Sequence, residues 1–197
     1  MRQGGGVMAL DLVTAAIIDM LRLSLANQPG VPPSAYKISL ASPNEGAADA
    51  DLVLFLYLVT PAADLRNAQR IRPWPTANDN PVLLEPAVPL ELHYLLTVGA
   101  GAPAGADGLG RLADAVRAIE TGSPLAVPAA FQEAVWLSLL PLNSDEMARI
   151  WGLFPNENCR SSIAFRASPV WIDPRAPAPS AAPVTDGDMR HARMESA

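Results

Sequence analysis

The stretch DLVLFLYLVTPAADLRN, residues 51–67, begins as an apolar run and ends in an arginine and an asparagine. Its first part, residues 51–59, is apolar at odd and even positions alike, which is typical of a strand in the interior of a sheet. The polar pair Arg66 and Asn67 then has two interpretations. Arg66 either donates hydrogen bonds to loop carbonyls beside a turn asparagine, or it lies in a protein interface, where bidentate arginines are enriched.

Three segments around this run have the apolar spacing of helices. The first two carry apolar residues three or four positions apart, and Gly122 is placed to end the second. The third follows Asn143, which can form a capping box with Glu146. The apolar stripes of the first two helices are Leu10, Val13, Ile17 and Leu21, and Leu109, Leu112, Val116 and Ile119.

Four further segments have strand patterns. Residues 36–43, YKISLASP, place Ile38 and Leu40 on one side, and residues 134–142, AVWLSLLPL, alternate apolar residues with Trp136 and Ser138. Residues 89–98, PLELHYLLTV, set four apolar residues against two polar ones. The last strand is SSIAFRASPVWID, residues 161–173, with a bulge expected at Pro169. The two faces of PLELHYLLTV are Leu90, Leu92, Tyr94 and Leu96, and Glu91 and His93.

The order of these segments predicts one α+β domain over residues 7–173. We expect a mixed sheet of about five strands, with about three helices packed mostly on one side. Residues 60–89 have no sustained period and predict a long connection, which in a compact domain is usually functional or disordered. Residues 174–197 are rich in alanine and proline, which predicts a flexible C-terminal tail.

Composition narrows the class of protein. The 197 residues are 50% hydrophobic, enough for a sizeable core in one domain. A net charge of -6 argues against nucleic acid as the main partner, because phosphate binding needs clustered positive charge. No stretch is as long as a membrane span, and Asp11 and Asp19 interrupt the apolar N-terminal segment, so we expect a soluble protein without a cleavable signal.

The sequence offers no catalytic constellation. The glycine-rich stretch GAGAPAGADGLG, residues 99–110, follows a strand and precedes a helix but matches no phosphate-binding motif, so it predicts a surface loop. His93 is expected to be a partly buried sheet residue with local hydrogen bonds, since His191, the other histidine, lies in the tail. Cys159, the single cysteine, is expected to be a half-buried structural thiol. We therefore expect no enzyme activity, no cofactor and no metal.

Five stretches together resemble one family. In order and spacing they are similar to the N-terminal domain of the cap protein of extracellular contractile injection systems, long known only as a domain of unknown function. The most specific matches are Leu-Tyr before Arg-Asn, then Leu-x-Tyr-Leu-Leu-Thr, and a tryptophan after an acidic helix start. One departure is Leu58, where the family would be expected to carry a polar or basic residue. The stretches are LFLYLVTPAADLRN, PLELHYLLT, LGRLADAVRAIETGSPL, SLLPLNSDEMARIWGLF and SSIAFRASPVWID. The matching residues are Leu56, Tyr57, Arg66, Asn67, Leu92, His93, Tyr94, Leu95, Leu96, Thr97 and Trp151.

The resemblance implies a structural role. Such proteins look like phage tail terminators, which form a six-fold ring that closes the end of the inner tube and the contractile sheath and stops their polymerisation. The implied partners are other copies of the chain, the tube protein and the sheath protein, with no nucleic acid and no membrane insertion. The implied location is the bacterial cytoplasm during assembly and then the particle, which can be released from the cell. The residues expected at the assembly interface are Arg66, Asn67, Arg70, Arg72 and Trp74.

Two other functions remain open from the sequence. The first is an adaptor or cargo-binding protein of the same particle, which would bind one client without forming rings. The second is a small enzyme that uses the glycine-rich loop, and this is the weakest of the three. Ring formation separates the terminator from the adaptor, and nucleotide binding would revive the enzyme.

Overall fold

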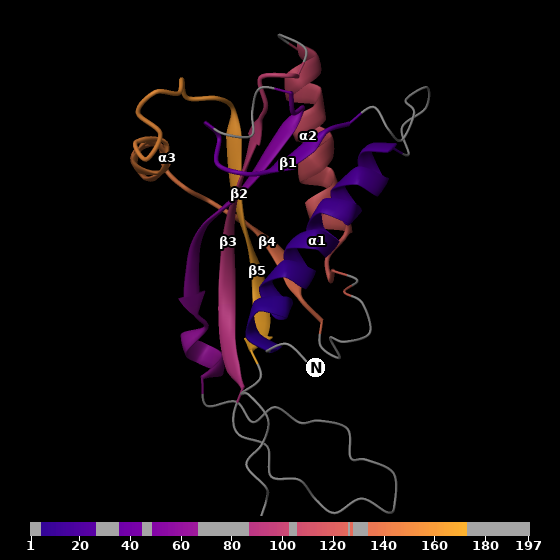
Figure 1. The fold of residues 1–197 in the computed structure, drawn as a ribbon, viewed down its shortest axis with the longest axis vertical. Helices are drawn as coiled ribbons and strands as arrows, with labels where there is room; N and C mark the ends of the chain where they lie inside the picture. Colours follow the sequence, from indigo (N-terminus) through magenta and orange to yellow (C-terminus); the bar gives the residue numbers. More distant parts are fainter. Residues whose placement is uncertain are drawn as a thin grey trace, which may run out of the picture.

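A computed structural model describes residues 5–26, 36–44, 49–66, 87–102, 106–125, 127 and 134–172. The order of elements predicted from the sequence is confirmed, and the described residues form a single α+β domain (Figure 1). The tail, residues 174–197, lies outside the described residues. The elements are α1 (Gly5–Ala26), β1 (Ile38–Leu40), β2 (Leu52–Pro61), the short 3-10 helix η2 (Ala63–Leu65), β3 (Val88–Val98), α2 (Ala106–Thr121), β4 (Trp136–Leu140), α3 (Ser144–Trp151) and β5 (Ser162–Ile172).

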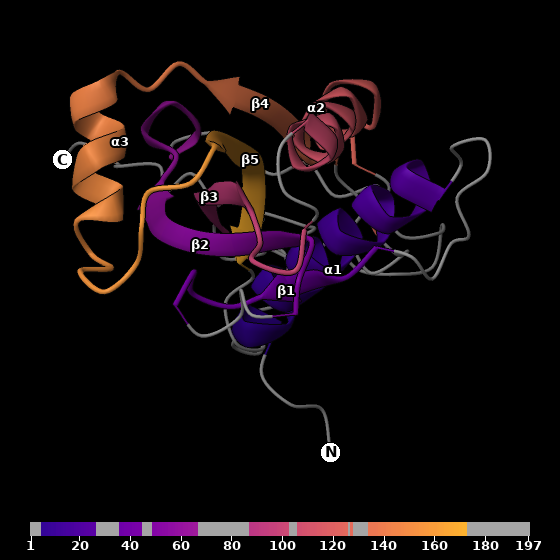
Figure 2. The ribbon, with the colours of Figure 1, turned by 90° about the horizontal axis from the view of Figure 1, so that it is seen from above.

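The five strands form one mixed sheet in the order β1-β2-β3-β5-β4. β1 pairs with β2 in parallel, and every other pair is antiparallel. Seen from above in Figure 2, α1 and α2 cover one face of the sheet and α3 lies on the other. The prediction that the helices pack mostly on one side therefore holds for α1 and α2. The packing of α3 on the opposite face was not predicted.

The main core lies between the sheet and the two long helices. The predicted stripe of α1 is confirmed, because Val13, Ile17 and Leu21 are fully buried. At the centre, the rings of Tyr94 and Phe165 stack with centroids 5.3 Å apart. Burial raises the pKa of Tyr94 to about 12, and its hydroxyl shares a 2.8 Å hydrogen bond with the Thr14 hydroxyl.

The predicted stripe of α2 is wrong in one position. Leu109 of α2 is 54% exposed, because α2 turns small residues such as Ala115 and Ala118 toward the core, which lets the helix lie close to the sheet. The predicted strand with Ile38 and Leu40 is present as β1, and Leu40 is 54% exposed because β1 is only three residues long and lies at the sheet edge. The long connection is shorter at both ends than predicted, because β2 continues to Pro61 and β3 begins at Val88.

Two β-bulges flank β3. On one side the register with β2 shifts between Leu56 and Leu58, which leaves Tyr57 as the extra residue of β2. On the other side Leu90 and Leu92 of β3 face Val170 and Ala167 of β5, so the extra residue belongs to β5. It falls at residues 168–169, where Pro169 predicted a bulge.

The predicted helix ends are also confirmed. In α3 the Asn143 side chain accepts from the Glu146 N–H, and the Glu146 carboxylate accepts from the Asn143 N–H, each at 2.9 Å. This capping box satisfies two N–H groups that an eight-residue helix would otherwise leave free. At the end of α2 the Gly122 N–H donates to the Ala118 carbonyl at 2.8 Å.

Candidate assembly surface

The predicted interface residues begin just after η2, the short helix that follows β2. Arg66 ends η2, where its backbone N–H donates to the Ala63 carbonyl at 3.3 Å, and its side chain is exposed. The N–H of Ala62 donates to the Pro89 carbonyl at 2.9 Å, which ties the start of η2 to β3. The structure therefore places Arg66 at the end of the sheet where the long connection leaves. The other predicted residues lie outside the described ranges; they are Asn67, Arg70, Arg72 and Trp74.

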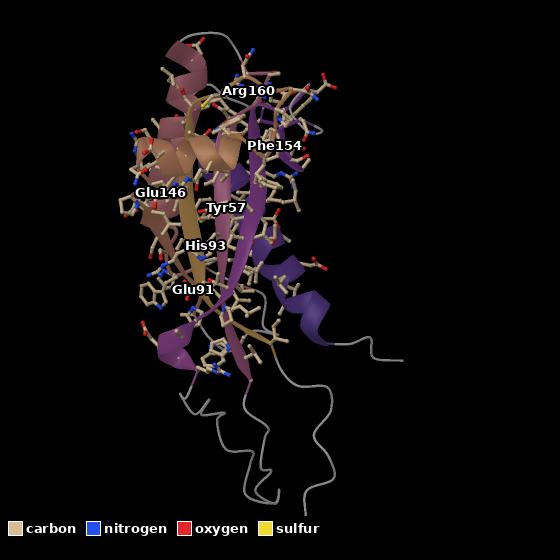
Figure 3. The ribbon with its side chains drawn as sticks, turned by 90° about the vertical axis from the view of Figure 1, so that its left-hand side faces the viewer. Tyr57, Glu91, His93, Glu146, Phe154 and Arg160 are labelled. Atoms are coloured by element: carbon tan, nitrogen blue, oxygen red, sulfur yellow. The ribbon has the colours of Figure 1, made fainter. Side chains whose placement is uncertain are left out.

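The face of the sheet opposite α1 and α2 is covered over only half of its length. α3 and the residues after it pack there through a small cluster centred on Leu95, Trp151 and Phe154. Figure 3 shows Tyr57, His93 and Glu91 following one another along the sheet away from α3. We call the uncovered half the open sheet face. Its residues are Leu58 and Thr60 of β2, Glu91 and His93 of β3, Arg166 of β5 and Trp136 of β4.

A polar network occupies the centre of the open sheet face. Arg166 donates from Nη1 to Glu91 Oε1 at 3.2 Å, and the other oxygen of Glu91 lies 3.6 Å from His93 Nε2. His93 Nε2 also lies 3.2 Å from the Thr60 hydroxyl, so the network joins three adjacent strands. The side chains of His93 and Glu91 are 15% and 22% exposed. The half-buried histidine with local hydrogen bonds is thus present as predicted.

Burial is the main influence on the pKa of His93. It lowers the pKa of the imidazole below its usual value, Glu91 raises it in part, and Arg166 lowers it further. A histidine with a lowered pKa in the folded chain is protonated first in the unfolded chain. The network therefore contributes stability above about pH 6.5, the ordinary histidine pKa, and loses it as the pH falls below that value.

We expect the urea midpoint of the chain to fall between pH 7 and pH 5.5, and His93→Gln to reduce this fall. Glutamine retains a polar group near Thr60 and Glu91 but does not titrate. Unfolding curves of both proteins at several pH values check the prediction. An equally steep fall in the variant would assign the pH dependence to other groups.

Large side chains flank the network on the outer strands. Trp136 of β4 is 54% exposed and Leu58 of β2 is 46% exposed. Trp, Tyr and Arg are the residue types that contribute most to protein interfaces. An apolar rim around a fixed polar centre, on a broad sheet face, suits contact with another protein.

Two glycines of the glycine-rich stretch have a structural role. Gly101 donates its N–H to the Ala50 carbonyl at 3.0 Å, and an added Cβ would lie 2.7 Å from the Asp49 carbonyl carbon. Gly99 also lies against Ala50, so these glycines allow two backbone segments to touch.

Cys159 is exposed, so the expected half-buried thiol is wrong.

The described residues offer neither a metal site nor a membrane span. Among them, no group of three or more His, Cys, Asp or Glu side chains could hold a metal ion. Within the same ranges, no helix is long and apolar enough to cross a membrane.

One buried ionic cluster was missed in the sequence. Asp51 is 7% exposed, accepts a hydrogen bond from the Lys37 N–H at 2.8 Å, and forms an ion pair with Arg111. The Arg111 guanidinium also lies over the Tyr36 ring, 5.1 Å from its centroid. The position of Asp51 just before an apolar strand was the one sign in the sequence that this carboxylate is buried. Its partner Arg111 lies 60 positions away in the sequence, so the pair could not be predicted.

Fold and surface together define a class of protein: a small α+β domain with a mixed sheet and a broad face suited to protein contact. Residues 12–186 match the sequence model of the Pvc16 N-terminal domain, and the chain belongs to that family. The resemblance found in the sequence is thereby confirmed. No match was found among curated proteins.

Two cryo-EM structures share the fold. The first is the sheath/tube terminator of an extracellular contractile injection system, PVC, in its extended state, with 21% identity over 100% of this chain and a TM-score of 0.65. The second is the tube-terminating cap of the anti-feeding prophage, with 19% identity over 91% of this chain and a TM-score of 0.62. The matched regions are 66% and 60% of those two chains, so this chain spans less than two thirds of either.

Proposed function

We propose that the chain is a cap, or tail terminator, of a contractile injection particle. In this role its copies form a ring on the last layer of the inner tube and the sheath, where they stop further polymerisation. The observation that carries the proposal is the match of the whole chain to a sheath/tube terminator with a TM-score of 0.65. Membership of the Pvc16 N-terminal domain family supports it.

The mechanism is capping by surface complementarity. A tube or sheath grows because each layer presents a rim that the next layer recognises. A ring that binds this rim and presents a different upper surface ends the growth. Identical subunits make such a ring through a head-to-tail contact that closes after a fixed rotation.

Two described surfaces suit these contacts. The open sheet face offers Trp136, Leu58 and the rigid network around Glu91. Arg66 lies exposed at the start of the long connection, where its guanidinium can bind carboxylates or carbonyls of a neighbouring subunit. The role requires no cofactor and no catalysis. We place its assembly in the cytoplasm, followed by incorporation into the particle.

The test is the length distribution of particles, measured by electron microscopy, after deletion of this gene in its host. We expect particles that are absent, lack the sheath or vary in length. Particles of normal number, length and sheath would reject the terminator and favour an adaptor that binds a client without forming a ring.

Complementation of the deletion tests Arg66 in the same assay. We expect Arg66→Ala to restore fewer full-length particles than the native gene, and Arg117→Ala to restore them fully. Arg117 is the matched control because it is an exposed arginine on α2, away from β2. Full particles with Arg66→Ala would remove this residue from the proposed contact.

A further inference from the structure

The outer side of β2 is open along most of the strand. β1 pairs with only Leu52, Val53 and Leu54, whereas β2 continues to Pro61. Within the described ranges, no strand pairs with the outer side of residues 55–61. Unpaired backbone N–H and C=O groups in a row are a template for a further strand.

The side chains at this edge are apolar on both faces. Leu58 is 46% exposed and lies on the same face as α3, whereas Val59 is 40% exposed and faces the other way. Proteins protect open edges with charged residues, prolines or bulges. Residues 52–61 contain no charged residue, and the protection here is limited to the bulge at Tyr57 and to Pro61 at the end of the strand. Apolar groups here suit an edge that another strand covers.

β4 forms the opposite edge of the same sheet. Its beginning is already covered, because the Leu125 N–H donates to the Val135 carbonyl at 2.8 Å and the Leu137 N–H donates to the Ser123 hydroxyl at 3.0 Å. Beyond Leu137, no described residue pairs with the outer side of β4. β4 runs opposite to β2, since both β2 and β5 are antiparallel to β3 and β4 is antiparallel to β5.

The two open edges lie at the same level of the sheet. Leu58 pairs with His93, His93 with Arg166, and Arg166 with Ser138, so one row of residues crosses from the β2 edge to the β4 edge. Leu58 and Ser138 therefore end the same row and point to the same face. A head-to-tail contact between them pairs residues of the same row, which is compatible with the closed ring proposed above.

We infer that the open edge of β2 pairs with β4 of a second copy of this chain, antiparallel, so that the sheets of neighbouring subunits are continuous. The contact lies beside the open sheet face and places Trp136 of one copy near Leu58 of the next. This inference rests on the proposed ring and names the contact that would hold it together.

A disulfide cross-link tests the pairing. In the full chain carrying Cys159→Ser, the changes Leu58→Cys and Ser138→Cys are combined and the purified protein is oxidised. Three strand spacings separate the two positions in one molecule, on the order of 14 Å, which no disulfide can bridge. The double variant should therefore give a ladder of multimers on a non-reducing gel, whereas Leu58→Cys alone should stay monomeric. No ladder, or efficient dimers of the single variant through two β2 edges, would overturn the inference.

A charge at the edge gives a second, independent readout. We expect Leu58→Lys to shift the oligomer to the mass of one chain in sedimentation velocity runs, and Leu23→Lys to leave the oligomer intact. Leu23 is the matched control because it is a 67% exposed leucine on α1. An oligomer that survives Leu58→Lys, or a native chain that is monomeric at every concentration, would overturn the β2–β4 contact. The gene deletion tests the terminator function without reference to this contact. A chain that fails both tests of the β2–β4 contact but controls particle length would therefore be a terminator that uses another contact.

Discussion

Replacing Arg111 with alanine should lower the free energy of unfolding by about 3 kcal/mol, since removing one partner leaves a buried charge uncompensated. The charge left behind is Asp51, whose side chain is 10% exposed and which, among the described residues, keeps the hydrogen bond from the Lys37 N–H. The change also removes the cation that lies over the Tyr36 ring. Chemical unfolding followed by far-UV circular dichroism measures the loss.

The same helix supplies the control for this prediction. Arg117 forms an ion pair with Asp114 at 3.2 Å, but its side chain is 74% exposed. Arg117→Ala should change the free energy of unfolding by less than about 0.5 kcal/mol, as is usual for exposed pairs. Equal losses for Arg111→Ala and Arg117→Ala would show that burial of the Asp51 pair adds nothing.

Trp151→Ala should also cost about 3 kcal/mol or more, the usual range for a large aromatic residue removed from a packed site. Trp151 is 6% exposed and packs edge-on against Phe154, which in turn packs edge-on against Phe55 of β2. Because this small cluster attaches α3 to the sheet, we expect the helix to lose its fixed position. Unfolding curves measure the cost, and hydrogen exchange of the α3 amides measures the local loosening.

Two variants sharpen the prediction for α3. Leu153 lies two residues further on and is 64% exposed in the native chain. Leu153→Ala should therefore leave the free energy of unfolding nearly unchanged. Trp151→Phe should cost less than Trp151→Ala, because phenylalanine keeps an aromatic ring in the cluster. Both changes also remove the buried indole N–H, which has no hydrogen-bond partner among the described residues. An α3 as well protected in Trp151→Ala as in the native chain would contradict its role as an anchor.

The sequence predicts the order of the elements because most of them carry a clear period. The stripe of α1, the alternation in β3 and β4, and the capping box of α3 are local signals, and all of them hold. The errors lie where tertiary packing decides. Leu109 fits a helical stripe, but α2 is rotated so that its alanines meet the sheet. The packing of α3 on the other face depends on Leu95 and Phe55, which an eight-residue helix does not reveal.

The candidate site is less predictable for a different reason. Arg66 was identified by its position after a strand, and the structure adds that it is exposed. The open sheet face could not be identified, because it needs the register of four strands to bring Leu58, His93, Arg166 and Trp136 onto one surface. The pair of Asp51 and Arg111 has the same difficulty, since nothing local to either residue indicates the other.

The two bulges beside β3 have a consequence for how the domain can be oriented. A bulge increases the local right-handed twist of its strand, and here one lies on each side of the same central strand. The half of the sheet under α3 and the half that is open are therefore turned relative to each other. One continuous surface faces two directions. In the proposed ring, a single domain could therefore contact both the subunit beside it and the layer below it without bending at a hinge.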